Sequence, residues 1–263
     1  IYAADLNLKA ERDFDVSIDL FDLLPAPYGL VRYGVAPDHP RIKGIIRALY
    51  EVLDRGDIRF FGNVKYGQDL DLEDLKKHYN AVIFATGAIK DAPLNIPGVE
   101  LEGSYGAADF VNWYDSHPDF PFTWPLDAKE VAVIGNGNVA LDVARMLVKG
   151  PDDLLGTDIP DHVYQGLKAS PVTDVHVFGR RGPAQVKFSP LELREALHIK
   201  GVQSIVIEEE FQYDAGSEAA IAGSNQIKVM VKTLEQLRDN PQQPAERRLH
   251  LHFFSSPVEI LGK

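Results

Sequence analysis

The chain has 263 residues, of which 45% are hydrophobic and 25% charged, and its formal net charge is −12. This composition is typical of a globular protein with one large or two modest domains. The acidic balance argues against nonspecific nucleic-acid binding. The absence of cysteine excludes disulfides and thiolate-ligated zinc or iron–sulfur centres in this chain. No apolar run is long enough to cross a bilayer.

The first elements resemble part of a nucleotide-binding unit. Residues 1–10 have a helical pattern, residues 16–21 alternate like a strand, and Asp22 follows that strand directly. A helix leading into a strand that ends in an acidic residue is the second half of a dinucleotide-binding βαβ unit. We therefore expect the first strand and its glycine turn to precede Ile1, in a longer protein cut at both ends.

The rest of the first part is expected to alternate loops, helices and strands. A segment rich in proline and glycine, residues 23–40, is too long for a simple turn and is predicted to be a functional loop. The further elements expected here are a helix over 42–53 and strands over 58–61, 64–66 and 79–87. Residues 95–98 are expected to interrupt the regular structure, with a linker beginning nearby.

The second part contains the clearer pattern. The expected elements are a helix over 108–114, strands over 131–134, 175–178, 202–207, 249–254 and 257–260, a long loop with one short helix over 150–170, a loop or short helix over 214–222, and a flexible turn over 240–246. Ser189 is a suitable N-cap for a helix that has Pro190 at its first position.

A glycine turn after residues 131–134 is the most informative motif. Gly135, Gly137 and Ala140 follow the pattern G-x-G-x-x-A between an apolar strand and an apolar-periodic helix. Gly135 permits a sharp turn, Gly137 allows the backbone to approach a pyrophosphate, and Ala140 lets helix and strand pack closely. The helix start that follows would face the anion with free N–H groups and a positive dipole end.

Arg180 and Arg181 follow the next strand and indicate which dinucleotide would bind. Two adjacent guanidinium groups at this position favour the 2′-phosphate of NADP, whereas a carboxylate would favour NAD. The alternative is a solvated basic turn. The pair lies 180 − 135 = 45 positions after Gly135, instead of the usual distance of roughly 20, so the segment 150–170 is interpreted as an insertion.

With these motifs, the chain resembles the adrenodoxin reductase-type ferredoxin–NADP+ reductases, which are FAD flavoproteins. The matching stretches are residues 24–32, 34–40, 61–64, 85–87, 95–98, 134–145, 179–183 and 191–195. The resemblance implies an α/β fold with two Rossmann-like, doubly wound dinucleotide-binding domains, in which the FAD domain is interrupted by an inserted NADP domain. Residues 1–103 would be part of the FAD domain and residues 104–263 the NADP domain, and both would be incomplete.

The resemblance also implies a set of FAD-binding residues. Asp22 would bind the FAD ribose; Leu30, Val31 and Arg32 would line the flavin; Val64 would contact the adenine; and Thr86 and Gly87 would pass beside FAD. Structural alternatives remain open for each: a solvated strand-end carboxylate, an ordinary surface loop, a core valine and the tight end of a buried strand.

The implied NADP site lies in the second part. Asn136, Gly137, Asn138 and Val139 would contact the pyrophosphate beside Gly135, Arg180 and Arg181 would bind the 2′-phosphate, and Glu192 would lie beside the ribose. His39 and Glu195 would form an active-site pair that positions the nicotinamide and manages a proton. From the residues alone, His39 could equally be a loop histidine, and Glu195 a surface carboxylate paired with Arg194 or Lys200.

The activity implied for the full protein is hydride transfer from NADPH to FAD, followed by single-electron transfer to a ferredoxin- or adrenodoxin-like iron–sulfur protein. The compartment would be bacterial cytoplasm or the mitochondrial matrix. Two alternatives are an NADPH-oxidising flavoprotein of the glutamate synthase small-subunit type and a catalytically silent nucleotide-binding fragment. No metal site is expected: His250 and His252 alternate along a strand and are predicted to form its outward face.

Overall fold

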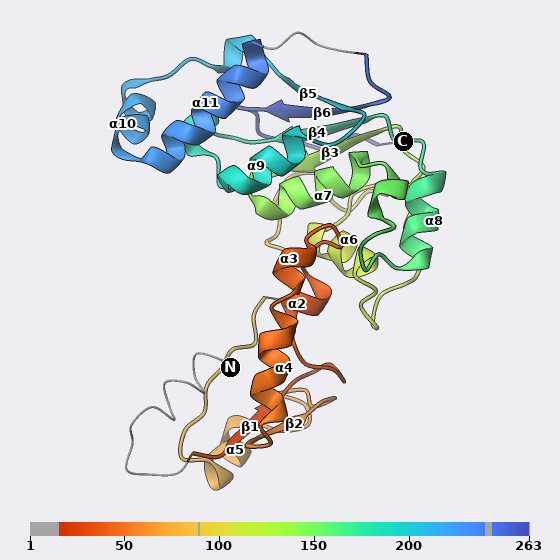
Figure 1. Cartoon of the computed structure of the whole chain (residues 1–263), viewed down its shortest axis with the longest axis vertical. Helices are drawn as coiled ribbons and strands as arrows, with labels where there is room; N and C mark the ends of the chain where they lie inside the picture. The colour runs from red at the N-terminus through yellow and green to blue at the C-terminus, as the bar shows by residue number, and fades with distance from the viewer. Residues whose placement is uncertain (1–15, 89, 240–243, 263) are drawn as a thin grey trace. The chain divides into compact units, whose positions relative to one another are not determined.

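The computed structural model describes residues 16–88, 90–239 and 244–262 (Figure 1). The chain forms two compact units, one comprising Ile1–Val35 and His39–Lys90 and the other Ala36–Asp38 and Asp91–Lys263. The helix expected over residues 1–10 lies outside the described residues. Within the described residues, no helix has the length and apolar character needed to span a bilayer.

The first unit is built on two parallel strands. β1 (Ile18–Phe21) pairs with β2 (Ile58–Phe61), so that Ile18 lies opposite Ile58 and Phe21 opposite Phe61. Both strands were expected from the sequence. The long loop before residue 40 contains a short helix, α2 (Leu30–Tyr33). The single helix expected over 42–53 is instead two helices, α3 (Pro40–Lys43) and α4 (Ile46–Asp54), because Gly44 and Ile45 interrupt it.

Two strands predicted in this unit are not formed. Residues 79–87 are irregular, and Ile83 and Phe84 are 63% and 53% exposed. A strand needs a neighbour to satisfy its backbone N–H and C=O groups, and no strand in the described part of the chain pairs with this segment. Residues 64–66 also form no strand, and Tyr66 makes only an isolated bridge with Leu70.

The sequence analysis also missed a helix, α5 (Leu72–His78), that has clear start and stop signals. The Asp71 side chain accepts from the backbone N–H of Asp74, and the Asp74 side chain accepts from the N–H of Asp71, which is a capping box. The last turn carries Lys76, Lys77 and His78, whose charges complement the C-terminal end of the helix dipole.

The second unit contains a four-stranded parallel sheet in the order β3-β4-β6-β5. Its strands are β3 (Glu130–Ile134), β4 (Asp174–Phe178), β5 (Val202–Val206) and β6 (Arg247–His252). The buried side chains of Val175, Val177, Leu249 and Leu251 alternate with polar ones. They face the helices α7 (Asn138–Val148), α9 (Pro190–Leu197) and α11 (Asn225–Asp239), which lie along one face of the sheet in Figure 1. The parallel sheets confirm the predicted α/β class.

The remaining elements of this unit connect these layers. They are α6 (Ala107–Tyr114), the 3₁₀ turns η1 (Pro151–Leu154), η2 (Pro183–Gln185) and η3 (Glu208–Glu210), and the helices α8 (Asp161–Ala169) and α10 (Ala215–Gly223). The helix α11 was not predicted. The strand expected over 257–260 is wrong: Ile260 donates one backbone hydrogen bond to Pro97 and joins no sheet.

The capping box of α5 can be tested without unfolding the protein. We expect Asp71→Ala to raise the amide hydrogen-exchange rates of Leu75 and Tyr79, which donate to the backbone of this helix, by about five-fold, because the cap that stabilises the first turn is lost. Asp71→Asn is the matched control, since asparagine is an equally good N-cap. Equal exchange rates in both variants would contradict this role.

Candidate functional site

The candidate site lies at the edge of the sheet where β3 and β4 end. Ile134 pairs with Phe178, so both parallel strands finish at the same level. The N–H of Gly135 donates to the carbonyl of Phe178 at 2.9 Å, and the N–H of Gly179 donates to the carbonyl of His252 at 2.8 Å. The glycine turn and the arginine-containing loop therefore start side by side, at the position where ligands bind in open α/β sheets.

The glycine turn has the geometry that its sequence pattern predicts. Gly135 has a φ of 137°, a value that side chains disfavour, and a Cβ placed there would lie 3.9 Å from the Cβ of Ala140. Gly137 precedes α7, and a Cβ there would meet no atom within 4 Å. Gly137 is the N-cap residue of α7, and no side chain in the described part of the chain makes a capping hydrogen bond at this position. The start of α7 therefore has no side-chain cap, and its first N–H groups form the positive end of the helix dipole.

The loop after β4 is held directly against this turn. A Cβ on Gly179 would lie 2.5 Å from Nδ2 of Asn136, so any larger residue at this point requires the Asn136 side chain to move. Arg180 and Arg181 follow at once, and both are exposed. Neither guanidinium has an ion-pair partner among the residues that the structure describes. The pair is therefore placed beside the glycine turn with its charge available to an anion.

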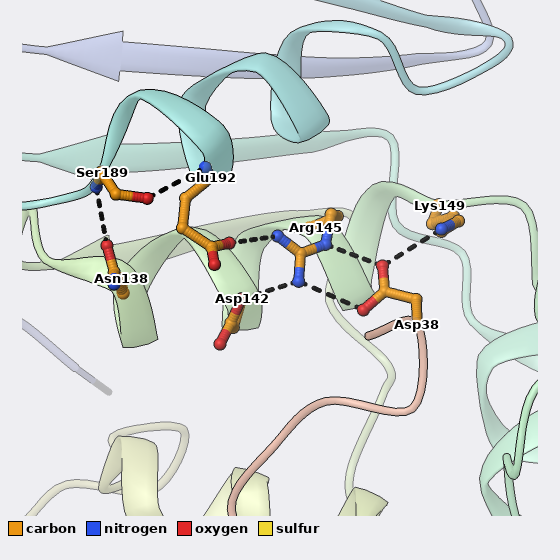
Figure 2. A network of polar contacts seen from close by, with 7 residues as sticks. All are labelled: Asp38, Asn138, Asp142, Arg145, Lys149, Ser189 and Glu192. Atoms are coloured by element: carbon orange, nitrogen blue, oxygen red, sulfur yellow. Dashed lines mark hydrogen bonds and ion pairs between the residues drawn. The ribbon is translucent and has the colours of Figure 1, made fainter. Parts of the chain in front are cut away.

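Two asparagines of the glycine turn and the start of α7 bind the segment that leads into α9. The carbonyl of Asn136 accepts from the N–H of Lys187 at 3.0 Å, and Oδ1 of Asn138 accepts from the N–H of Ser189 at 2.8 Å (Figure 2). Ser189 is the expected N-cap of α9, because its Oγ accepts from the N–H of Glu192 at 3.2 Å. Asn136 and Asn138 therefore have structural roles that the sequence analysis did not foresee.

A buried guanidinium lies behind the turn. Arg145 on α7 is 1% exposed and contacts three carboxylates (Figure 2). Its Nε and Nη2 donate to the two oxygens of Asp38 at 2.7 and 3.1 Å, Nη2 donates to Asp142 at 2.7 Å, and Nη1 donates to Glu192 at 3.0 Å. Lys149 adds a second cation, 3.1 Å from Asp38. The group joins α7, α9 and the Ala36–Asp38 segment of the same unit.

The protonation states of this cluster follow from its pairing. Burial acts to raise the pKa of Asp38, but the hydrogen bonds and charge of Arg145, with Lys149, hold that pKa below its ordinary value. Burial acts to lower the pKa of Arg145, and the hydrogen bond and charge of Asp38, with those of its other carboxylate partners, raise it above its ordinary value. Both groups therefore stay ionised at neutral pH.

This cluster was not predicted, although part of its signal is in the sequence. Asn138, Asp142, Arg145 and Lys149 recur at spacings of four, three and four residues and form a polar stripe on a largely apolar helix. Such a stripe indicates a polar contact surface. Its partners, Asp38 and Glu192, lie 107 and 47 positions away from Arg145, and only the tertiary structure brings them to it.

All the residues predicted to bind NADP belong to the second unit, but Glu192 already has a partner within the protein. Its carboxylate binds Arg145, and the residue is 6% exposed. The contact of Glu192 with a ribose stays a prediction. Glu195 lies one turn further along α9, whereas His39 precedes α3 in the first unit. Since the two belong to different units, their pairing also stays a prediction.

In the first unit, two of the predicted FAD residues adjoin each other. Asp22 directly follows β1, and its backbone carbonyl accepts from the N–H of Val64 at 3.0 Å. One oxygen of the Asp22 side chain accepts from the N–H of Leu24 at 2.9 Å, which orients the carboxylate at the strand end.

The other predicted FAD residues lie on α2 and on the irregular segment. Leu30 is exposed at the start of α2. The Arg32 guanidinium donates to the carbonyl of Pro27 and lies over the ring of Tyr28. Thr86 and Gly87 are exposed in the segment that forms no strand.

The buried cluster can be tested by removing its cation. We expect Arg145→Met to lower the free energy of unfolding by about 3–5 kcal/mol, because it leaves Asp38 and Glu192 buried without their counter-ion. Lys149→Met, at a more exposed position, should cost less than about 1 kcal/mol. Urea unfolding of the three proteins measures both values, and a similar loss in both variants would contradict the central role of Arg145.

The same variant should change the dependence of stability on pH. The pKa of Asp38 is lowered in the folded protein, so its contribution is present above the unfolded pKa and is lost as the pH falls through the folded value. Without Arg145, only Lys149 opposes the effect of burial, so the pKa of Asp38 should rise. We expect the acid-unfolding midpoint of Arg145→Met, followed by circular dichroism, to lie at higher pH than that of the parent chain.

The close approach at Gly179 gives a third prediction. Gly179→Ala should destabilise the unit by about 1–3 kcal/mol, since the new methyl group overlaps Asn136. The loss should be smaller when Asn136 is also replaced by glycine, as measured by a double-mutant cycle. Gly156→Ala, where a Cβ meets no atom within 4 Å, is the control. Additive effects of the two substitutions would exclude this contact as the cause.

Comparison with known proteins identifies relatives along the whole chain. It is 44% identical over its full length to the NADPH-ferredoxin reductase FprA of Mycobacterium tuberculosis, and 40% identical over 99% of its length to the mitochondrial NADPH:adrenodoxin oxidoreductase of Arabidopsis thaliana. The chain spans 58% and 55% of these two proteins, respectively. No protein-family model matches it.

The structural comparison agrees. The structure of Mycobacterium tuberculosis FprA in complex with NADPH superimposes with a TM-score of 0.92 and 42% sequence identity, over 99% of this chain and 58% of that one. Sequence similarity and fold therefore point to the same group of reductases. The chain belongs to the family of NADPH–ferredoxin and NADPH:adrenodoxin reductases.

Proposed function

We propose that this chain is the nucleotide-binding part of an NADPH-dependent ferredoxin reductase. The observation that carries the proposal is the exposed pair Arg180 and Arg181, held against the glycine turn and the start of α7. An adenosine 2′-phosphate requires cations beside the ribose, and a pyrophosphate requires free N–H groups at a helix start. This edge of the sheet offers both.

The residues of the second unit would bind the nucleotide in a defined order. The amides from Asn136 to Val139 would bind the pyrophosphate, and the two guanidinium groups would bind the 2′-phosphate through charge-assisted hydrogen bonds. Asn136 and Asn138 would contribute mainly by holding the neighbouring segments in place. Because NADH has no 2′-phosphate, the arginine pair would make the enzyme specific for NADPH.

The first unit would hold FAD, with Asp22 at the ribose and Val64 near the adenine. The carboxylate of Asp22 lies at the end of a parallel strand, which is the place for a ribose ligand, and it is already oriented by the Leu24 amide. The segment 30–32 and Thr86 with Gly87 would lie beside the flavin, and His39 with Glu195 would position the nicotinamide. FAD supplies the conversion of a hydride into single electrons.

The electron acceptor proposed is a ferredoxin- or adrenodoxin-like iron–sulfur protein. The relatives, an NADPH-ferredoxin reductase and an NADPH:adrenodoxin oxidoreductase, support this acceptor over that of a glutamate synthase. The net charge of −12 argues against nonspecific binding of a nucleic acid. Relatives occur in bacteria and in mitochondria, so the bacterial cytoplasm or the mitochondrial matrix is the proposed compartment.

The nucleotide preference gives the test. Calorimetric titration with 2′,5′-ADP and with 5′-AMP separates the 2′-phosphate from the rest of the nucleotide. We expect the double variant Arg180→Ala, Arg181→Ala to weaken 2′,5′-ADP binding by at least about 30-fold, because two charge-assisted contacts are lost. Binding of 5′-AMP should change little.

Lys232→Ala, which removes an exposed cation from α11, is the control and should leave both affinities unchanged. Equal losses for the two nucleotides would remove the basis for the proposed specificity. In the full reductase, the same double variant should raise the KM for NADPH and leave that for NADH nearly unchanged. Cytochrome reduction with and without added ferredoxin then tests the acceptor.

A further inference from the structure

Three histidines meet on the face of the second sheet that is opposite α7, α9 and α11. His176 lies on β4 and is the direct cross-strand partner of His250 on β6. His252 follows two residues after His250 and therefore points to the same face. All three side chains are half-buried. The sequence shows only that His250 and His252 alternate along one strand. The pairing of β4 with β6 places His176 next to them.

The distances between these side chains are close to those of a metal site. One ring nitrogen of each histidine lies within 4.8 Å of the others, and Nδ1 of His176 lies 2.9 Å from Nε2 of His252. A tetrahedral zinc ion with Zn–N distances near 2.0–2.1 Å needs its nitrogens about 3.3 Å apart. The three strand positions therefore bring the ring nitrogens to within about 1.5 Å of the spacing that a tetrahedral site requires.

The orientation of the rings is the part that has to change. The rings of His176 and His250 are stacked, with centroids 4.1 Å apart and an interplanar angle of 12°. Lone pairs lie in the ring planes, so stacked rings do not direct them to one point. Rotation about the Cβ–Cγ bonds would make them converge, and it would replace the hydrogen bond between His176 and His252 by two bonds to the ion.

Asp174 determines which nitrogen of His250 is available. Its carboxylate makes two hydrogen bonds with Arg248 and lies 2.8 Å from Nε2 of His250. The two hydrogen bonds from Arg248 stabilise the carboxylate form of Asp174, which accepts a hydrogen bond from His250. Nε2 of His250 is thus the N–H, and Nδ1 remains to bind an ion, as in carboxylate–histidine–metal arrangements.

The hydrogen bond between Nδ1 of His176 and Nε2 of His252 uses a ring N–H of one of the two side chains. Binding of one ion to both of these nitrogens therefore requires a change of tautomer in this pair.

We propose that His176, His250 and His252 form a binding site for a divalent transition-metal ion of the zinc class, with Asp174 orienting His250. The ligand set of three imidazole nitrogens suits zinc, copper, nickel and cobalt, and it does not suit magnesium or calcium, which prefer oxygen. A bound ion would link β4 to β6 and keep a fourth position for water.

Metal titration of the chain tests the proposal. The chain is purified without a polyhistidine tag, treated with a chelator and titrated with zinc chloride in a calorimeter and with cobalt chloride in a spectrophotometer. We expect one equivalent of zinc to bind and to raise Tm, and cobalt to produce visible absorption bands of a tetrahedral site. His176→Gln and His252→Gln should each weaken zinc binding at least ten-fold and abolish the rise in Tm.

Two exposed histidines away from the sheet provide matched controls. His78→Gln and His198→Gln should bind zinc as the parent chain does. Zinc binding that is unchanged in His176→Gln, or the absence of saturable binding by the parent chain, would overturn the proposal.

A measurement on the unmutated chain covers the case in which the variants fold poorly. Nitrogen–proton NMR spectra of the imidazoles, recorded with and without zinc, should shift for His176, His250 and His252. Shifts confined to the remaining histidines would also overturn the proposal.

Discussion

The architecture of the candidate site depends on one buried cation. Arg145 binds Asp38, Asp142 and Glu192, which come from three different segments of the second unit. Asp38 and Glu192 are buried with the guanidinium, and the cost of burying that cation is offset only by several hydrogen bonds to carboxylates. The cluster therefore specifies one arrangement of α7 and α9. The glycine turn precedes α7, and the Ser189 cap begins α9. The cluster around Arg145 therefore fixes the two helices whose N-termini border the proposed nucleotide site.

The chain uses arginine in two opposite environments within this unit. At Arg145 all three guanidinium nitrogens donate to carboxylates of the protein, and the charge is neutralised internally. At Arg180 and Arg181 the side chains are exposed beside a helix start that also attracts anions. The first environment contributes structural specificity, and the second provides local positive charge on an acidic chain, at the place where we propose that the nucleotide phosphate binds. A count of charged residues cannot separate these roles, because burial and pairing determine them.

The local sequence pattern was sufficient to predict those elements whose periodicity and turn residues indicate the same structure. The strands β3, β4 and β6, the glycine turn, α7 and the Ser189 cap were predicted because apolar periodicity and turn residues agree at each of them. Residues 79–87 have an equally strong strand pattern, yet they lack a paired neighbour among the described residues and remain irregular.

Contacts between segments that are distant in the sequence could not be predicted from local patterns. The partners of Arg145 and the histidine group on β4 and β6 depend on which segments the fold brings together, and no single segment contains that information. For the candidate site, the sequence predicted the residues at the loop ends, and the structure adds the groups that support them. The close approach at Gly179 also limits redesign: an engineer who wished to change the proposed cofactor preference could exchange both arginines, but any residue larger than glycine in front of them would have to displace the side chain of Asn136 in the glycine turn.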